Sequence, residues 1–293
     1  MKCFLCGSVD HTIFDRPKSF GVPLVYYQCK RCGLIFQSPE DSQAGSPNFY
    51  IETYRKIYQN DVNPTEKDLW VQNRRAPYLV KILQQHMVRH PGRILDIGAS
   101  TGLLLETFQE FFNAAGMGIE PGDAYRAFAE AKGLKMVDSL DRLISSDPEP
   151  FDLVSMIHVL EHLPDPIGTL REIREQLLAK DGLLLVEVPN FYAHDSYELA
   201  HLACFTPHTL REVLKQSGFQ MKTMRQHGNP RSTLVKLYIT SIAQPLPEGV
   251  AVPPVEPEKF VRLKRHMGFV YRRVVQKLCP HKAWLPLLGE KAS

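Results

Sequence analysis

The stretch Arg93-Ile-Leu-Asp-Ile-Gly-Ala-Ser-Thr-Gly-Leu-Leu-Leu-Glu-Thr-Phe108 predicts the fold of this chain. A short apolar run contains Asp96, Gly98 and Gly102 bracket a tight loop, and an apolar helical pattern follows at once. A parallel α/β sheet uses this order of strand, glycine loop and helix to bring its backbone close to a nucleotide-like cofactor. The stretch therefore predicts a cofactor site at the end of a buried strand.

Strand-like and helix-like patterns alternate from Arg93 onward. We expect strands at 93–97, 116–120, 134–137, 152–157 and 182–188, and helices at 102–112, 123–132, 166–178 and 207–217. Two further β-like runs, at 219–226 and 232–240, are expected to pair antiparallel at the edge of the sheet. The alternation predicts a mostly parallel sheet with helices on both faces.

The glycine spacing distinguishes between two kinds of cofactor. A nicotinamide site requires G-x-G-x-x-G, whereas here Asp96-x-Gly98-x-x-x-Gly102 lacks the third glycine and carries an acid. A carboxylate in the loop repels a pyrophosphate and attracts a positively charged cofactor. Glu120 ends the next strand about 20 residues later, where an acid accepts the protons of ribose hydroxyls.

These residues resemble the first motif of the class I S-adenosylmethionine-dependent methyltransferases, with Ser100 departing from its three-glycine pattern. The resemblance extends over about residues 90–226, through 158–166 (HVLEHLPDP) and 201–206 (HLACFT). It implies a Rossmann-like α/β sheet and S-adenosylmethionine as cofactor. The implied cofactor residues are Asp96, Gly98, Ala99, Ser100, Gly102, Glu120, Pro121, Asp138 and His158. For Asp138, a turn or helix-cap role is an open alternative.

Two cysteine pairs near the N-terminus predict a metal centre. Cys3-x2-Cys6 and Cys29-x2-Cys32 have the spacing that aims four thiolates at one tetrahedral ion. With no position left open, this is a structural zinc ribbon; the alternative is four unligated thiols. A glycine able to adopt positive φ follows the second cysteine of each pair.

Zinc ribbons often bind nucleic acid, so the module raises an RNA-directed alternative. The interval between the cysteine pairs holds little basic charge, and the whole chain carries only +3, which favours neither RNA nor DNA. The module also resembles the N-terminal zinc-binding segment of small-molecule methyltransferases, including sugar C-methyltransferases. That resemblance implies a lid formed around Phe49, Tyr50, Tyr54, Arg55 and Tyr58.

Histidines are the candidates for removing a proton from the acceptor near neutral pH. His158, His162 and His201 lie at or near expected carboxyl ends of strands. His201 is the first choice, because sugar C-methyltransferases place a Glu-His pair there. Ala200 precedes it in this chain, which departs from that subgroup.

The 293 residues divide into four expected parts: a zinc ribbon (1–38), a lid and helical connector (39–90), a methyltransferase domain (91–240), and a Pro-rich linker with a basic amphipathic helix (241–293). We expect the apolar stripe of that last helix to dock on the catalytic domain with its basic face in water. The alternative is an anionic partner: RNA, an acidic membrane or a nucleotide-linked substrate.

The sequence thus predicts a zinc-containing methyltransferase for a small-molecule acceptor, first of all a sugar or polysaccharide precursor. An RNA methyltransferase and a non-catalytic methyltransferase-like scaffold are the alternatives. No membrane-span or signal-peptide pattern is present in the sequence, so we expect a cytoplasmic protein.

Overall fold

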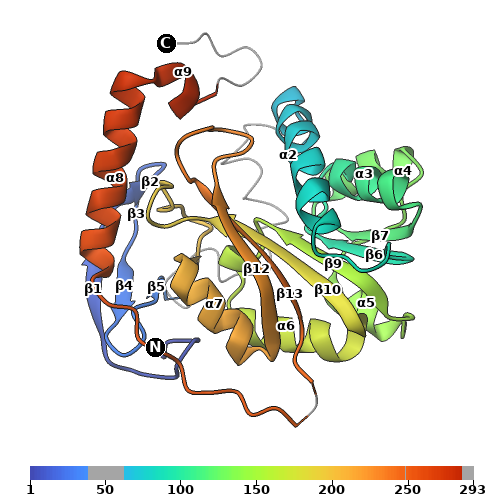
Figure 1. Cartoon of the computed structure of the whole chain (residues 1–293), viewed down its shortest axis with the longest axis horizontal. Helices are drawn as coiled ribbons and strands as arrows, with labels where there is room; N and C mark the ends of the chain where they lie inside the picture. The colour runs from blue at the N-terminus through green and yellow to red at the C-terminus, as the bar shows by residue number, and fades with distance from the viewer. Residues whose placement is uncertain (39–62, 248, 286–293) are drawn as a thin grey trace.

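A computed structural model describes residues 1–38, 63–247 and 249–285, and a seven-stranded sheet forms its centre (Figure 1). The strand order is β12-β13-β10-β9-β6-β7-β8. The five strands from β10 to β8 are parallel, and β13 and β12 add antiparallel pairs at one edge. Their bounds are β6 Arg93–Ile97, β7 Ala115–Ile119, β8 Met136–Val137, β9 Phe151–Ile157, β10 Leu178–Pro189, β12 Phe219–His227 and β13 Tyr238–Pro245.

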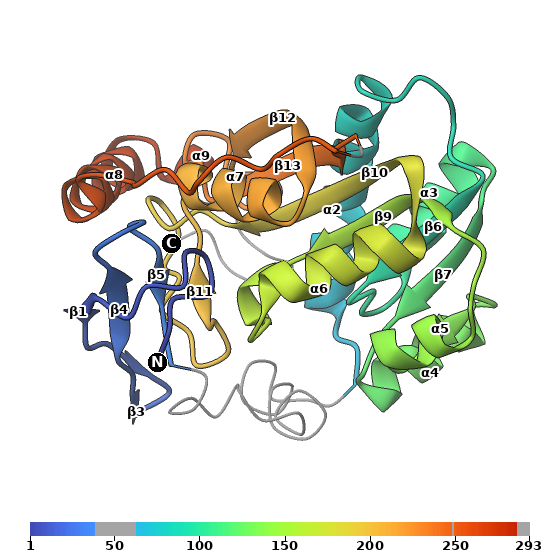
Figure 2. The same cartoon turned by 90° about the horizontal axis from the view of Figure 1, so that it is seen from below.

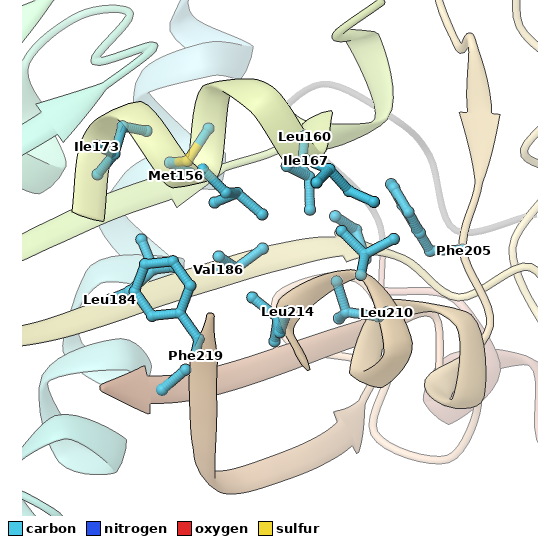
Figure 3. Packing of buried hydrophobic residues seen from close by; sticks show 14 of the residues in the cluster. Met156, Leu160, Ile167, Ile173, Leu184, Val186, Phe205, Leu210, Leu214 and Phe219 are labelled. Carbon is cyan, nitrogen blue, oxygen red and sulfur yellow. The ribbon is translucent and has the colours of Figure 1, made fainter. Parts of the chain in front are cut away.

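Helices cover both faces of this sheet because successive residues of its buried strands point to opposite sides. On one face, Ile94 and Leu153 pack with α2 (Glu66–Gln84) and α3 (Leu103–Phe112). The other face packs against α5 (Leu140–Ser145), α6 (Pro166–Glu172) with its π-helical continuation Ile173–Leu177, and α7 (Pro207–Gln216). Figure 3 shows this second core, in which Leu210 and Leu214 lie over Val186.

The expected α/β alternation and the antiparallel edge are confirmed, with three local differences. The last strand, expected at 232–240, is β13 at Tyr238–Pro245, since residues 228–237 form the connection from β12. The strand expected at 134–137 is shortened to β8 at Met136–Val137. The helix expected at 166–178 ends in the π-helical turn, and β10 begins at Leu178.

The N-terminal module is joined to the catalytic part through a shared sheet. Its strands β1 (His11–Asp15), β4 (Tyr26–Cys29) and β5 (Ile35–Phe36) are extended by β11 (Ala203–Cys204), and a hairpin of β2 (Lys18–Ser19) and β3 (Val22–Pro23) lies beside them. Strand β11 pairs antiparallel with β5 and begins two residues after His201. The N-terminal module is therefore attached at the segment that carries His201, the first candidate for the catalytic base.

The C-terminal helix lies along the outer edge of the molecule beside the N-terminal module (Figures 1 and 2). It comprises α8 (Val261–Leu278) followed by the short α9 (Pro280–Ala283). The expectation that its apolar stripe docks on the body is wrong. Arg265 and Arg272 face the body and donate to main-chain carbonyls, whereas Leu263 and Met267 are exposed. Arginine stems and guanidinium planes pack well on aromatic rings. The basic face of the helix therefore points to the body and the apolar face points outward, the reverse of the expected arrangement.

Membrane spans can be assessed over the described parts of the chain. None of the helices there combines the length and apolarity needed to cross a bilayer.

Candidate active site

The loop after β6 is held in a left-handed backbone conformation. Gly98, Ser100 and Gly102 have φ of 76°, 52° and 74°, and the amides of Gly98 and Ala99 both donate to the carbonyl of Ile119 at 2.8 and 2.9 Å. A Cβ on Gly98 would come within 2.4 Å of Val159 Cγ2, so this glycine is required by space as well as by φ. The loop therefore follows its neighbouring strand closely at the carboxyl edge of the sheet.

Asp96 lies beneath this loop, with 2% of its surface exposed. Its carboxylate accepts a hydrogen bond from Ser155 Oγ at 2.6 Å. Burial raises the pKa of Asp96 to about 7; the Ser155 bond opposes this shift, and the nearby charge of Glu120 adds to it. A cationic ligand above the loop would favour the ionised form of this buried acid.

Glu120 connects the glycine loop to the next turn. One of its carboxylate oxygens accepts from the Ser100 amide and the other from the Gly122 amide, both at 2.9 Å. A carboxylate oxygen can accept more than one hydrogen bond, so an acid at this position is chemically suited to ribose hydroxyls. Sequence reasoning found the acid but not its bonds to the two loop amides.

The remaining predicted cofactor residues lie on the same edge. Ala99 is buried within the loop, and Pro121 lies between Glu120 and Gly122. Asp138 accepts bonds from Ser139 Oγ and Arg142 at 2.9 Å, and these two hydrogen bonds lower its pKa. It directly precedes α5, whose N-cap is Ser139, so the structure gives it local helix-end partners.

Helix α2 brings further polar groups that sequence reasoning missed. Gln72 accepts from Thr101 Oγ1 at 2.7 Å, and Arg75 forms an ion pair at 2.9 Å with the fully buried carboxylate of Glu187 on β10. The signal available in the sequence was a charged residue, Arg75, within the helical pattern. A charge that becomes buried needs a partner, here Glu187. Through these bonds the helix is fixed next to the glycine loop.

His158 follows β9 and lies between two acids. Its Nδ1 is 3.2 Å from Glu161 Oε1, its Nε2 is 3.4 Å from Glu187 Oε1, and its side chain is 25% exposed. Burial and Arg75 act to lower its pKa, but the hydrogen bonds to Glu161 and Glu187 outweigh them and raise it. The two acids thus hold the pKa of His158 above its ordinary value at the carboxyl end of the sheet.

His162 and His201 lie against each other, with ring centroids 5.0 Å apart. The Nδ1 of His162 is 2.9 Å from the Ala200 carbonyl, and the Nδ1 of His201 is 3.0 Å from the Ser196 carbonyl. Because a carbonyl only accepts, each Nδ1 carries the proton and Nε2 carries the lone pair in the neutral ring. Burial lowers the pKa of His162 to about 4, so that ring is neutral near pH 7. The structure thus brings all three predicted histidines into one region.

The same region also has the donors of a possible metal site. One ligand atom from each of Glu161, His162 and His201 lies within 4.8 Å of the others. The four N-terminal cysteines form a second such group.

The four N-terminal cysteines converge as their spacing predicted. The Sγ atoms of Cys3 and Cys32 are 3.6 Å apart and those of Cys6 and Cys29 are 3.5 Å apart, and all four sulfurs lie within 4.8 Å of one another. A tetrahedron of sulfurs about 2.3 Å from a zinc ion has edges of about 3.8 Å, so the donor set fits this metal. The glycine after each pair, Gly7 and Gly33, adopts the expected positive φ.

The module also binds the main chain around His201. Tyr26 donates its hydroxyl to the Glu198 carbonyl at 2.9 Å, and Gln37 Nε2 donates to the His201 carbonyl at 2.7 Å. The main-chain N–H of Gln37 donates to the Leu202 carbonyl at 2.9 Å. Tyr26 and Gln37 are themselves buried, so these bonds form in a dry interface.

The lid residues expected around Phe49, Tyr50, Tyr54, Arg55 and Tyr58 lie outside the described residues.

Comparison with known proteins agrees with this geometry. A family model described as methyltransferase domain matches residues 71–223, just over half of the chain. The chain belongs to this family. Membership and the seven-stranded sheet confirm the expected class I S-adenosylmethionine-dependent methyltransferase and its Rossmann-like fold.

Individual relatives of this methyltransferase family member match over shorter stretches. Ubiquinone biosynthesis O-methyltransferases of Actinobacillus pleuropneumoniae serotype 7 (strain AP76) and Nitrosospira multiformis are 31% identical over 108 residues and 33% identical over 96 residues. The matches cover 33% and 30% of this chain, and the chain spans less than half of each relative (46% and 39%). The PH0226 protein of Pyrococcus horikoshii OT3 shares the fold, with a TM-score of 0.51 at 14% identity over 67% of this chain and 99% of that one.

Proposed function

We propose that this chain transfers a methyl group from S-adenosylmethionine to a small-molecule acceptor. The observation that carries the proposal is the pair of buried carboxylates at the glycine loop, Asp96 beneath it and Glu120 bonded to the Ser100 amide. When bound, the cofactor supplies a methyl group on a positively charged sulfur. Its charge and its ribose hydroxyls complement one acid each, whereas a pyrophosphate would be repelled.

An oxygen acceptor is the class we favour. The curated relatives are named O-methyltransferases, and an acceptor hydroxyl needs a nearby base, which the histidine region offers. A sugar or polysaccharide precursor is the first acceptor class to test, and a ubiquinone precursor, the substrate class in the relatives' names, is the second.

His201 is the proposed base for the acceptor proton. Its Nδ1–H is held by the Ser196 carbonyl, so its Nε2 lone pair is the atom that receives the proton as the acceptor oxygen gains the methyl group. Glu198 Oε2, 3.5 Å from that Nε2, would stabilise the resulting imidazolium. His162 packs on the same ring and orients it, and His158 is proposed to contact the cofactor.

The four cysteines are proposed to hold one structural zinc ion. The bonds from Tyr26 and Gln37 to the segment of His201 give the module a role in the catalytic part of the molecule. This role favours a small-molecule enzyme over an RNA-binding ribbon.

The test is incubation of the purified chain with S-adenosylmethionine and fractionated cell metabolites, followed by mass spectrometry for a gain of one methyl group. The account expects a methylated small molecule that the Glu120→Ala variant produces more slowly at a limiting concentration of S-adenosylmethionine. Methyl transfer to total cellular RNA and not to metabolites would support the RNA alternative. If the chain bound the cofactor but methylated no compound in any metabolite fraction, the result would support the alternative of a non-catalytic methyltransferase-like scaffold.

A further inference from the structure

The outer face of α8 carries a continuous apolar stripe. Its members recur every three or four residues, apart from one adjacent pair, and their exposed fractions range from 43% to 72%. They are Phe260, Leu263, Met267, Val270, Tyr271, Val274 and Leu278. Folded monomers rarely expose so many large apolar side chains side by side, so the stripe is typical of an interaction surface.

The opposite face of the helix is fixed to the body, which prevents the stripe from turning inward. Arg262 donates to the Phe14 carbonyl at 2.7 Å and Arg272 to the Ala193 carbonyl at 3.0 Å. The Arg265 guanidinium lies 3.9 Å from the centroid of the Phe191 ring. Gly268 approaches Tyr192 so closely that a Cβ would come within 1.9 Å of its carbonyl oxygen.

The sequence that carries the stripe is strongly basic. The segment from Lys259 to Leu285 contains eight lysines and arginines and no aspartate or glutamate. Arg262, Arg265 and Arg272 among them face the body, and Lys264 pairs with Glu258. The whole chain has a net charge of +3, so the rest of the chain carries −5. Pairing this helix with the same helix of a second copy would bring two strongly basic segments together, which opposes self-association through the stripe. An anionic surface matches both the charge and the apolar side chains.

We propose that the outer face of α8 docks on an anionic lipid membrane. The helix lies in the plane of the interface, with Leu263, Met267 and Val270 inserted below the headgroups and Arg273 and Lys277, both exposed, at the lipid phosphates. This is attachment to one leaflet and not a membrane span. The proposal does not depend on the methyl-transfer activity.

The test is co-sedimentation of the full chain with vesicles of phosphatidylcholine alone or of phosphatidylcholine with phosphatidylglycerol. We expect binding only to the anionic vesicles, weakened by salt because surface charges are screened. Replacing Arg273 and Lys277 by glutamine should weaken vesicle binding by about thirtyfold, since each basic residue near the surface adds about 1 kcal/mol.

The triple variant Leu263→Ser/Met267→Ser/Val270→Ser should abolish vesicle binding. The matched control is Val9→Ser/Val88→Ser/Val250→Ser, which removes three exposed valines elsewhere and should bind as the wild type does. Calorimetric affinity for S-adenosylmethionine shows whether each variant is folded. Absence of vesicle binding in the wild type would overturn the proposal. So would a dimer seen by light scattering that the triple variant dissociates, or binding to RNA that displaces vesicles.

Discussion

Replacement of Asp96 by asparagine tests the electrostatics of the site directly. The pKa of this buried acid rises from 3.8 to about 7, chiefly because burial disfavours its charge. Between these two pH values the folded protein keeps the proton while the unfolded chain releases it, so stability falls as pH rises. A difference of about three pKa units corresponds to about 4 kcal/mol. Above pH 7 both states are ionised and the penalty stays constant.

The amide of the Asp96→Asn variant would keep the bond from Ser155 Oγ but would carry no titrating proton. In the absence of cofactor, we therefore expect this variant to gain stability relative to wild type by up to about 4 kcal/mol between pH 4 and 7, roughly 10 °C in melting temperature. Cofactor affinity should change in the opposite direction, because the variant lacks the charge that attracts a cation.

The assay is denaturant unfolding of wild type and variant at several pH values from 4.5 to 8, without ligand. The matched control is Asp141→Asn, which makes the same substitution at an exposed aspartate on α5. A stability difference for Asp96→Asn that does not change with pH would refute the reasoning, since Asp96 would then titrate alike in both states.

Four further predictions concern the site and the module. Glu120→Ala should weaken cofactor binding by tenfold or more by removing the acceptor of two loop amides; calorimetry that finds unchanged affinity would refute the ribose assignment. His201→Asn should lower kcat by about a hundredfold with little effect on cofactor affinity, and equal loss of both would indicate a structural residue. Metal analysis of gently purified protein should find zinc, and the Cys29→Ser variant should lose it. In that variant kcat should fall more than cofactor affinity, because the His201 segment loses its anchor on the N-terminal module. Wild-type protein without zinc would contradict the zinc ribbon. Tyr26→Phe, which removes the hydroxyl that contacts the Glu198 and His201 carbonyls and accepts from Gln37 Nε2, should show a weaker form of the same split between kcat and affinity, and an unchanged kcat would argue against the anchor.

Much of the fold followed from local patterns. The strand containing Asp96 and the tight loop bracketed by Gly98 and Gly102 were predictable, because a glycine loop between a buried strand and an amphipathic helix has few solutions. The convergence of the cysteines was equally predictable from a repeated spacing.

Long-range contacts could not be obtained from local patterns. The ion pair of Arg75 with Glu187 joins residues more than one hundred positions apart, and strand β11 completes a sheet begun by the N-terminal module. Helix α8 shows the same limit: its periodicity predicted two faces, but only the aromatic rings and carbonyls presented by Phe14 and Phe191 determine that the arginines turn inward.

The most direct test of the central claim is calorimetric titration of the wild-type chain with S-adenosylmethionine, with NAD as the competing cofactor. The arrangement of Asp96, the glycine loop and Glu120 predicts one S-adenosylmethionine bound per chain and no measurable heat with NAD. Saturable binding of NAD without binding of S-adenosylmethionine would contradict the account.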